Sequence, residues 1–128
     1  TQAEADAIAE EMERAWRNPQ MADWFGGGWR VLREVSVLRP KDEYDADVAA
    51  WRNMPAEQRG PMPKRELRPD RVMVRDDEAV VLDFKFGKHN HTKYSAQVEQ
   101  YMSLLRQMGY SPVTGYLWYG NDGELVKV

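Results

Sequence analysis

The sequence predicts an α/β domain with a mixed central sheet and flanking helices. Apolar residues recur at helical spacing near the N-terminus and again after residue 91, whereas the segments around them alternate apolar and polar residues as strands do. Clusters of glycine, proline and asparagine separate these segments. The expected order is helix, strand, strand, strand, helix, strand, strand, in which the helices pack on the faces of the sheet.

The first part of the chain is expected to be helical and then extended. Asn18-Pro19 ends a helix over 2–17, and a short helical turn over 19–25 follows. Three glycines then break the chain. Residues 29–38 alternate in character, and we expect one strand with both faces partly covered.

The second part is expected to contain a β-hairpin, a long helix and two further strands. The hairpin turns near Asp76-Asp77, and Gly109 stands at the favoured position after the helix. The expected bounds are 66–74 and 79–86 for the hairpin strands, 92–108 for the helix, and 113–119 and 124–128 for the last strands.

A length of 128 residues predicts one domain, 1–128. Within it, we expect 40–64 to be an irregular insertion, with a short helix over 44–51 and a proline-rich remainder. The chain begins in helix-like sequence without methionine, so we expect a fragment of a longer protein. It has no cysteine, which excludes disulfides and thiolate metal sites.

Charge and hydropathy restrict the setting and the partners. The net charge is -3, but basic residues gather at 59–71 and 85–93, which is compatible with DNA contact or with a solvated face. No apolar run is long enough to span a membrane, and the start is not a signal peptide. A cytoplasmic location is therefore expected.

The informative constellation is Asp70 with Asp83 and Lys85. In the strand over 79–86, Asp83 and Lys85 share one face and the opposite face is apolar. If Asp76-Asp77 is a two-residue turn, Asp70 lies opposite Asp83 with Cβ atoms about 5 Å apart. Like charges so close destabilise a sheet unless a cation lies between them, so the pattern favours bound Mg²⁺ or Mn²⁺.

Such a site suits phosphodiester hydrolysis. A divalent ion polarises the phosphoryl oxygen and acidifies water, while a neighbouring lysine offsets developing negative charge. The pattern Asp-x-Lys by itself is more often a surface ion pair on an edge strand. The functional interpretation depends on the combination of Pro69-Asp70 with Asp83-x-Lys85 inside an apolar strand.

Further residues extend this pattern into a family resemblance. The run Arg68-Pro69-Asp70, then Asp83-Phe84-Lys85-Phe86-Gly87, then Tyr94 and Gln97-x-x-x-Tyr101 resembles the PD-(D/E)XK nucleases of the RecB/AddA group. The resemblance covers about 29–39 and 66–128. It implies a restriction-endonuclease-like fold, a DNA substrate and a helicase domain or subunit as partner.

The resemblance also implies roles for individual residues. Asp70, Asp83 and the main-chain carbonyl of Phe84 would be metal ligands, Lys85 the catalytic lysine, and Gln97 and Tyr101 neighbours of the active site. Phe86 stands where the family usually has threonine. The family usually takes a further metal ligand from an upstream histidine, and no histidine precedes His89 here.

Several secondary candidates have two interpretations each. Glu34 either completes the acidic site or forms an ion pair at a strand edge. A loop and two arginines are candidates for contacts with DNA phosphates, or are simply solvated: Lys88, His89, His91, Lys93, Arg68 and Arg71. The two histidines are not expected to form a metal pair.

The sequence predicts a metal-dependent DNA nuclease. We expect it to be an exonuclease that acts at DNA ends in recombination or repair. Two alternatives stay open. One is a catalytically inactive DNA-binding or scaffolding module that keeps the nuclease fold. The other is a restriction- or repair-type endonuclease, which the pattern Gln97-x-x-x-Tyr101 disfavours.

Overall fold

The structure is a computed structural model that describes the backbone of residues 1–128 and all side chains except those of Ala7, Ile8, Glu11 and Met12. The chain forms two compact units, and the single domain expected from its length stays a prediction. The first unit comprises Thr1–Val35 and Pro69–Val128, and the second unit is the intervening segment Ser36–Arg68.

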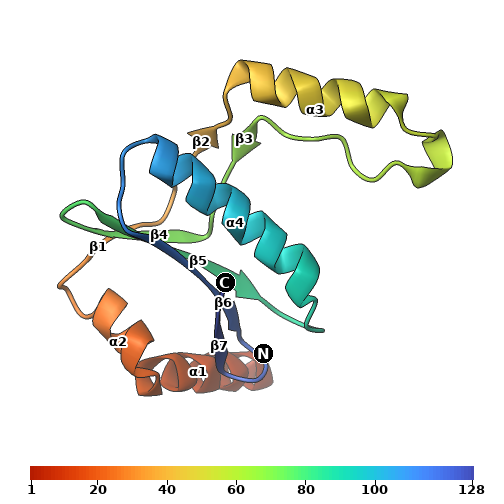
Figure 1. The fold of residues 1–128 in the computed structure, drawn as a ribbon. Helices are drawn as coiled ribbons and strands as arrows, with labels where there is room; N and C mark the ends of the chain where they lie inside the picture. The colour runs from red at the N-terminus through yellow and green to blue at the C-terminus, as the bar shows by residue number, and fades with distance from the viewer. The chain divides into compact units, whose positions relative to one another are not determined.

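The first unit contains a five-stranded mixed sheet with helices on both faces, which confirms the predicted fold class (Figure 1). The strand order is β1-β4-β5-β6-β7; β5 and β6 are parallel and the other neighbours are antiparallel. Its elements are α1 (Gln2–Arg17), α2 (Pro19–Phe25), β1 (Arg30–Leu32), β4 (Arg71–Arg75), β5 (Glu78–Lys85), α4 (His91–Gln107), β6 (Val113–Tyr119) and β7 (Glu124–Lys127).

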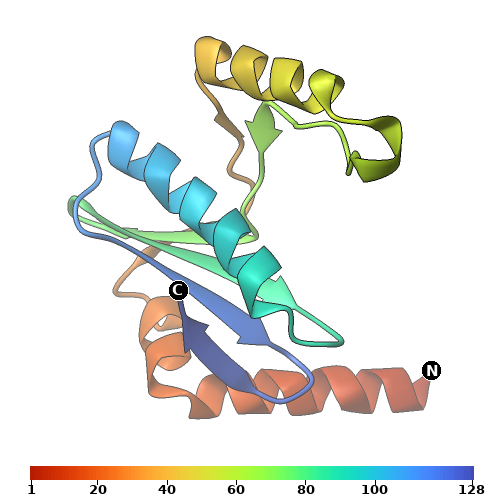
Figure 2. The same cartoon turned by 45° about the vertical axis from the view of Figure 1, so that its right-hand side comes forward.

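The helices divide between the two faces of the sheet. Both views place α4 on one face and α1 with α2 on the other (Figures 1 and 2). On the α4 face, Gly115 of β6 lets the helix approach closely, because a Cβ atom there would lie 2.5 Å from atoms of Val98 and Met102. On the other face, one buried cluster joins α2 to the central strands: Met21, Trp24, Trp29, Met73, Val80, Leu82, Tyr116 and Trp118.

The helix starts follow local capping chemistry. Thr1 forms a capping box with Glu4 at the start of α1. The side chain of Asn18 accepts hydrogen bonds from two amides of α2, and the side chain of Asn90 accepts one from Lys93 at the start of α4. The predicted helices over 2–17, 19–25 and 92–108 are confirmed to within one residue at each end.

The hairpin has the predicted register. Val72 pairs with Val81 and Arg75 with Glu78, on either side of the turn at Asp76-Asp77. Asp76 adopts φ of 53°, a left-handed conformation that aspartate tolerates better than most residues. The ladder runs as far as Arg71 and Leu82, so Asp70 and Asp83 come one position beyond its last pair.

Two predicted strands are wrong in extent. The strand over 29–38 ends at Leu32, the chain bends at Arg33-Glu34, and the short strand β2 (Val37–Leu38) follows in the second unit. The strand over 66–74 is also broken. Its start is β3 (Glu66–Leu67), which pairs with β2 in the second unit. Pro69 separates β3 from β4, because proline has no amide hydrogen to donate to a ladder.

The predicted irregular insertion over 40–64 contains more helix than expected. A helix, α3 (Lys41–Asn53), replaces the short one predicted over 44–51, and a single 3₁₀ turn, η1 (Ala56–Gln58), follows it. Asp42 and Glu43 in the first turn suit the positive end of a helix dipole. Within this second unit, Trp51 donates to the carbonyl of Gly60 at 2.9 Å, with the guanidinium of Arg59 5.1 Å from its ring centre.

No helix in the described part of the chain is long and apolar enough to cross a membrane.

Candidate active site

Asp70 and Asp83 lie at the end of the sheet where β4 begins and β5 ends. The amide of Asp70 donates to Asp83 Oδ1 at 3.1 Å, and the amide of Phe84 donates to Asp70 Oδ2 at 2.8 Å. Each carboxylate is therefore fixed by a backbone amide of the opposite strand. The structure thus brings together the two acids that the sequence paired.

Burial and charge act together on this acid pair. Asp83 is 3% exposed, while Asp70 is half-buried. Burial raises the pKa of Asp83, and the negative charge of Asp70 raises it further; the amide of Asp70 and the ammonium of Lys85 oppose this. The site therefore holds negative charge at an electrostatic cost, which a bound cation would remove.

The side chain of Lys85, the last residue of β5, is held in place by contacts with β5 and α4. Its Nζ lies 3.3 Å from Asp83 Oδ2 and donates to Gln97 Oε1 at 2.8 Å. The same nitrogen lies 4.7 Å from the ring centre of Tyr94. Three contacts from two elements hold one ammonium group next to the acid pair, so its position depends on the packing of α4.

Tyr101 lies one helical turn after Gln97 and is buried on the same face of α4. Burial raises the pKa of its hydroxyl to about 12, with contributions from the charges of Asp83 and Asp70. The hydroxyl therefore stays protonated at neutral pH and can donate a hydrogen bond. The residues predicted to flank the site, Gln97 and Tyr101, do lie beside it.

Glu34 was expected in the first strand, but it lies exposed at the bend after β1. Among the described residues, Glu34 does not join Asp70 and Asp83 in a group of side chains close enough to share a metal ion. The bend at Arg33-Glu34 ends the strand that would have carried it to the acid pair. A role for Glu34 stays a prediction.

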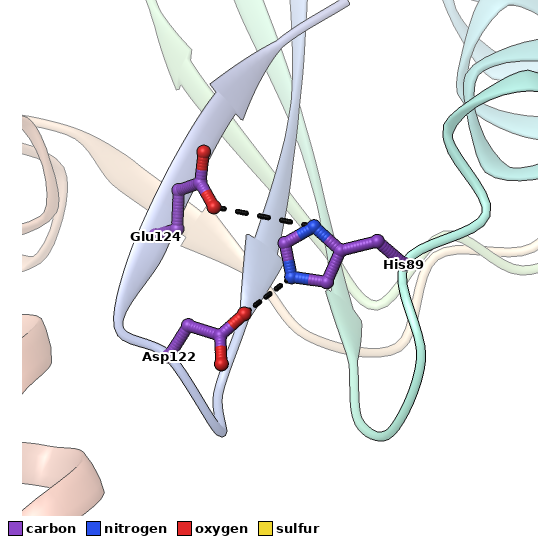
Figure 3. A group of neighbouring side chains, drawn as sticks. All are labelled: His89, Asp122 and Glu124. Atoms are coloured by element: carbon purple, nitrogen blue, oxygen red, sulfur yellow. Dashed lines mark hydrogen bonds and ion pairs between the residues drawn. The ribbon is translucent and has the colours of Figure 1, made fainter.

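His89 has partners that sequence reasoning missed. Figure 3 shows its imidazole between two carboxylates, with Nε2 2.5 Å from Asp122 Oδ2 and Nδ1 4.0 Å from Glu124 Oε2. The ring also stacks on Tyr119 at 3.6 Å between centroids. The two acids face different ring nitrogens, and one ligand atom from each of the three side chains lies within 4.8 Å of the others, close enough to share a metal ion. No sequence pattern indicated these contacts, because Asp122 and Glu124 are far from His89 along the chain.

The other candidates for DNA contact are spread over both units. Lys88, His91 and Lys93 are exposed at the start of α4 or just before it, and His91 Nε2 lies 3.1 Å from Ser95 Oγ. Arg68 belongs to the second unit, where it pairs with Glu66 at 2.9 Å. Arg71 lies at the end of the sheet, where its Nη1 donates to the carbonyl of Asp70 at 2.6 Å.

The donor set fits a hard divalent cation. Among the described residues, Asp70 Oδ2 and Asp83 Oδ1 accept backbone amides, so Asp70 Oδ1 and Asp83 Oδ2, the latter 3.3 Å from Lys85 Nζ, would face a cation. Carboxylate and carbonyl oxygens suit Mg²⁺ or Mn²⁺ better than softer ions. The negative charge of Asp70 next to the buried Asp83, a repulsion that a cation would relieve, agrees with such an ion.

Comparison with known families agrees with this geometry. The model of the PD-(D/E)XK nuclease superfamily matches residues 1–127. The chain belongs to the PD-(D/E)XK nuclease superfamily. Members of this superfamily are in general nucleases that use divalent metal ions. No curated protein matches the chain at a significant level.

Membership explains why acids and lysine meet at the end of a mixed sheet. The name of the superfamily describes the pattern that Asp70, Asp83 and Lys85 display: an acid after proline, and then an acid and a lysine separated by one residue. The family match therefore confirms the predicted resemblance at the level of the superfamily.

Proposed function

We propose that this chain is a Mg²⁺- or Mn²⁺-dependent deoxyribonuclease domain of the RecB/AddA group, part of a longer cytoplasmic helicase-nuclease that processes DNA ends in recombination or repair. The observation that carries the proposal is the fixed position of Lys85 Nζ, between Asp83 Oδ2 and Gln97 Oε1, beside the reciprocally bonded acid pair.

Asp70, Asp83 and the carbonyl of Phe84 would hold the ion. A divalent ion in this position supplies Lewis-acid polarisation of a phosphodiester and acidifies water. The backbone amides of Asp70 and Phe84 orient the two carboxylates before any ion arrives, so little reorganisation is needed on binding.

Lys85 would act on the phosphate itself. Its ammonium is only partly exposed, so its positive charge is weakly screened and offsets negative charge that develops during hydrolysis. Gln97 keeps this ammonium in place by accepting its hydrogen bond. The protonated hydroxyl of Tyr101 adds a neutral donor at the same face.

Calorimetry with Mn²⁺, followed by cleavage of labelled linear single-stranded DNA, tests the proposal. The wild type is expected to bind Mn²⁺ and to cleave, and Asp83→Asn to lose both. Lys85→Met is expected to retain binding and to lose cleavage about 100-fold or more, as when a transition-state donor is removed. Asp77→Asn is the matched control, because Asp77 is exposed in the hairpin turn.

Each alternative predicts a different result. If the wild type binds DNA but neither binds Mn²⁺ nor cleaves DNA, the inactive DNA-binding or scaffolding module is established instead. Circular single-stranded DNA separates the two nuclease types, because an exonuclease leaves it intact and an endonuclease does not. Gel filtration adds a second criterion, since a stable dimer would favour the restriction-type alternative.

A further inference from the structure

A cavity of about 500 Å³ lies in the first unit, on the sheet face opposite the acid pair. It is open to solvent and is formed by α1, α2 and the ends of the central strands. Its lining is mainly apolar: Ala15, Trp16, Met21, Phe25, Val31, Arg33, Arg71, Phe84, Phe86 and Trp118. The volume is in the range of about 300–1,000 Å³ that is typical of pockets for small molecules.

The cavity and the acid pair share the same end of the sheet. Side chains alternate between faces along a strand, so Arg71 points away from Asp70 and Phe84 away from Asp83 and Lys85. Beyond Leu32, β1 no longer covers the start of β4. A flexible strand that crosses this end of the sheet would meet the acid pair on one face and the cavity on the other.

Exposed aromatic rings are the first unusual feature of this cavity. The side chains of Trp16 and Phe86 are 57% and 60% exposed. The ring of Phe86 lies over Gly120, where a Cβ atom would be only 2.4 Å from Phe86 Cε1, so a larger residue there would displace the ring. Flat rings left open to solvent in a concave site suit stacking with another flat ring.

Arginines are the second feature. The guanidinium of Arg71 lies 5.5 Å from the ring centre of Phe84, and Arg33 is exposed at the bend after β1. Neither arginine forms an ion pair with a carboxylate among the described side chains. Guanidinium groups beside an aromatic pocket complement a ligand that combines a planar ring with a phosphate.

We propose that this cavity binds one unpaired base of a single-stranded DNA substrate, next to the phosphate at the acid pair. Trp16 and Phe86 stack on the base, while Arg71 and Arg33 contact the adjoining phosphates. The inference rests on the proposed nuclease function and names its substrate as single-stranded. An unpaired base enters without the unstacking cost that a base in a duplex must overcome.

Binding to short labelled single-stranded oligonucleotides tests the pocket independently of cleavage. All proteins carry Asp83→Asn and are measured in EDTA, so that no strand is cut. Trp16→Ala and Phe86→Ala are each expected to raise Kd about tenfold, which lies within the usual effect of losing one base–aromatic stack. Met108→Ala is the matched control, because Met108 is 61% exposed on the same unit and does not line the cavity.

A scan with a single abasic nucleotide identifies the base. One abasic position is expected to weaken binding about as much as Phe86→Ala does, and to have no further effect in the protein that carries Phe86→Ala. Trp16→Phe should keep the affinity and reduce the quenching of tryptophan fluorescence on binding. Circular dichroism verifies that each variant is folded.

The outcomes separate the pocket from the nuclease. If the wild type with Mn²⁺ cleaves DNA but the pocket variants bind as Met108→Ala does, the base-binding inference is overturned and the proposed function stands. If position-specific binding is found without cleavage by the wild type, the nuclease proposal fails and the pocket remains. A uniform abasic effect at all positions also overturns the pocket.

Discussion

At the scale of single residues, Asp83 is subject to opposing influences that make its charge unfavourable without a cation. Burial and Asp70 raise its pKa in the folded state, so the folded protein binds this proton more readily than the unfolded chain does. Ionisation of Asp83 does not lower the free energy of unfolding below the unfolded pKa, near 3.9. The destabilisation develops as pH rises from there and is complete above the folded pKa. At neutral pH in EDTA, Asp83 therefore costs stability.

Asp83→Asn is expected to raise the free energy of unfolding at pH 7 in EDTA, because the neutral amide avoids the desolvation cost of the buried carboxylate. The gain should shrink near pH 4, where the wild-type carboxyl is increasingly protonated. Urea unfolding at both pH values measures it, with Asp77→Asn as control. A variant less stable than the wild type at pH 7 would show that Lys85 outweighs burial.

Gln97 is expected to act by positioning Lys85. Gln97→Ala removes the acceptor of the 2.8 Å hydrogen bond, so the ammonium loses one of its fixed contacts. We expect kcat to fall about 10- to 100-fold, as small displacements of catalytic groups do, with KM changed little. Gln107→Ala, at the exposed end of α4, is the control. If Gln97→Ala has the same kcat as the control, Gln97 does not position Lys85 for catalysis.

At the scale of elements, α4 couples packing to the site. The helix lies against β6 at Gly115 and carries Gln97 to Lys85. Gly115→Ala is expected to destabilise the fold by about 1–3 kcal/mol, because the new methyl group overpacks against Val98 and Met102. Thermal unfolding measures this loss.

Gly28→Ala is the control for that substitution, since a Cβ atom at Gly28 meets nothing within 4 Å. The same displacement of α4 should lower kcat of Gly115→Ala. Unchanged stability with reduced kcat, or the reverse, would contradict the coupling of packing and activity.

Much of this arrangement was predictable from local patterns, and the failures have physical causes. The register from Asp76-Asp77 placed Asp70 near Asp83 because side-chain alternation and turn length fix a hairpin. The break at Pro69 and the bend at Arg33-Glu34 were missed, since alternation alone does not show where a ladder ends. The contacts of His89 with Asp122 and Glu124 were missed because they join segments that are distant in sequence.

At the scale of the whole molecule, the second unit is an elaboration of one connection. It leaves the first unit after Val35 and returns at Pro69, and Leu32 and Val72, three residues from each junction, are paired in the sheet. The insertion predicted over 40–64 lies within this unit, which extends four residues further at each end. The helix α3 shows that the segment has its own structure, although its prolines favoured an irregular loop.

Replacement of 36–68 by a short glycine-serine linker is expected to leave the first unit folded, because the paired positions need only a hairpin connection. Mn²⁺ affinity should stay within about threefold of the intact chain, as expected for a surface insertion. Calorimetry and circular dichroism measure both. If the shortened chain is unfolded, the second unit has a structural role. If the shortened chain is folded but does not bind Mn²⁺, the second unit contributes a metal ligand.

The acid pair, the lysine and their helical partners all fall between Asp70 and Tyr101, in one hairpin and the helix that follows it. Their mutual contacts therefore span short sequence separations and carry a small loop-closure entropy. The residues of the site come from one continuous stretch of chain, whereas the lining of the cavity on the opposite face also draws on α1 and α2 near the N-terminus. The two faces of one sheet therefore differ in the sequence separation of the segments that build them.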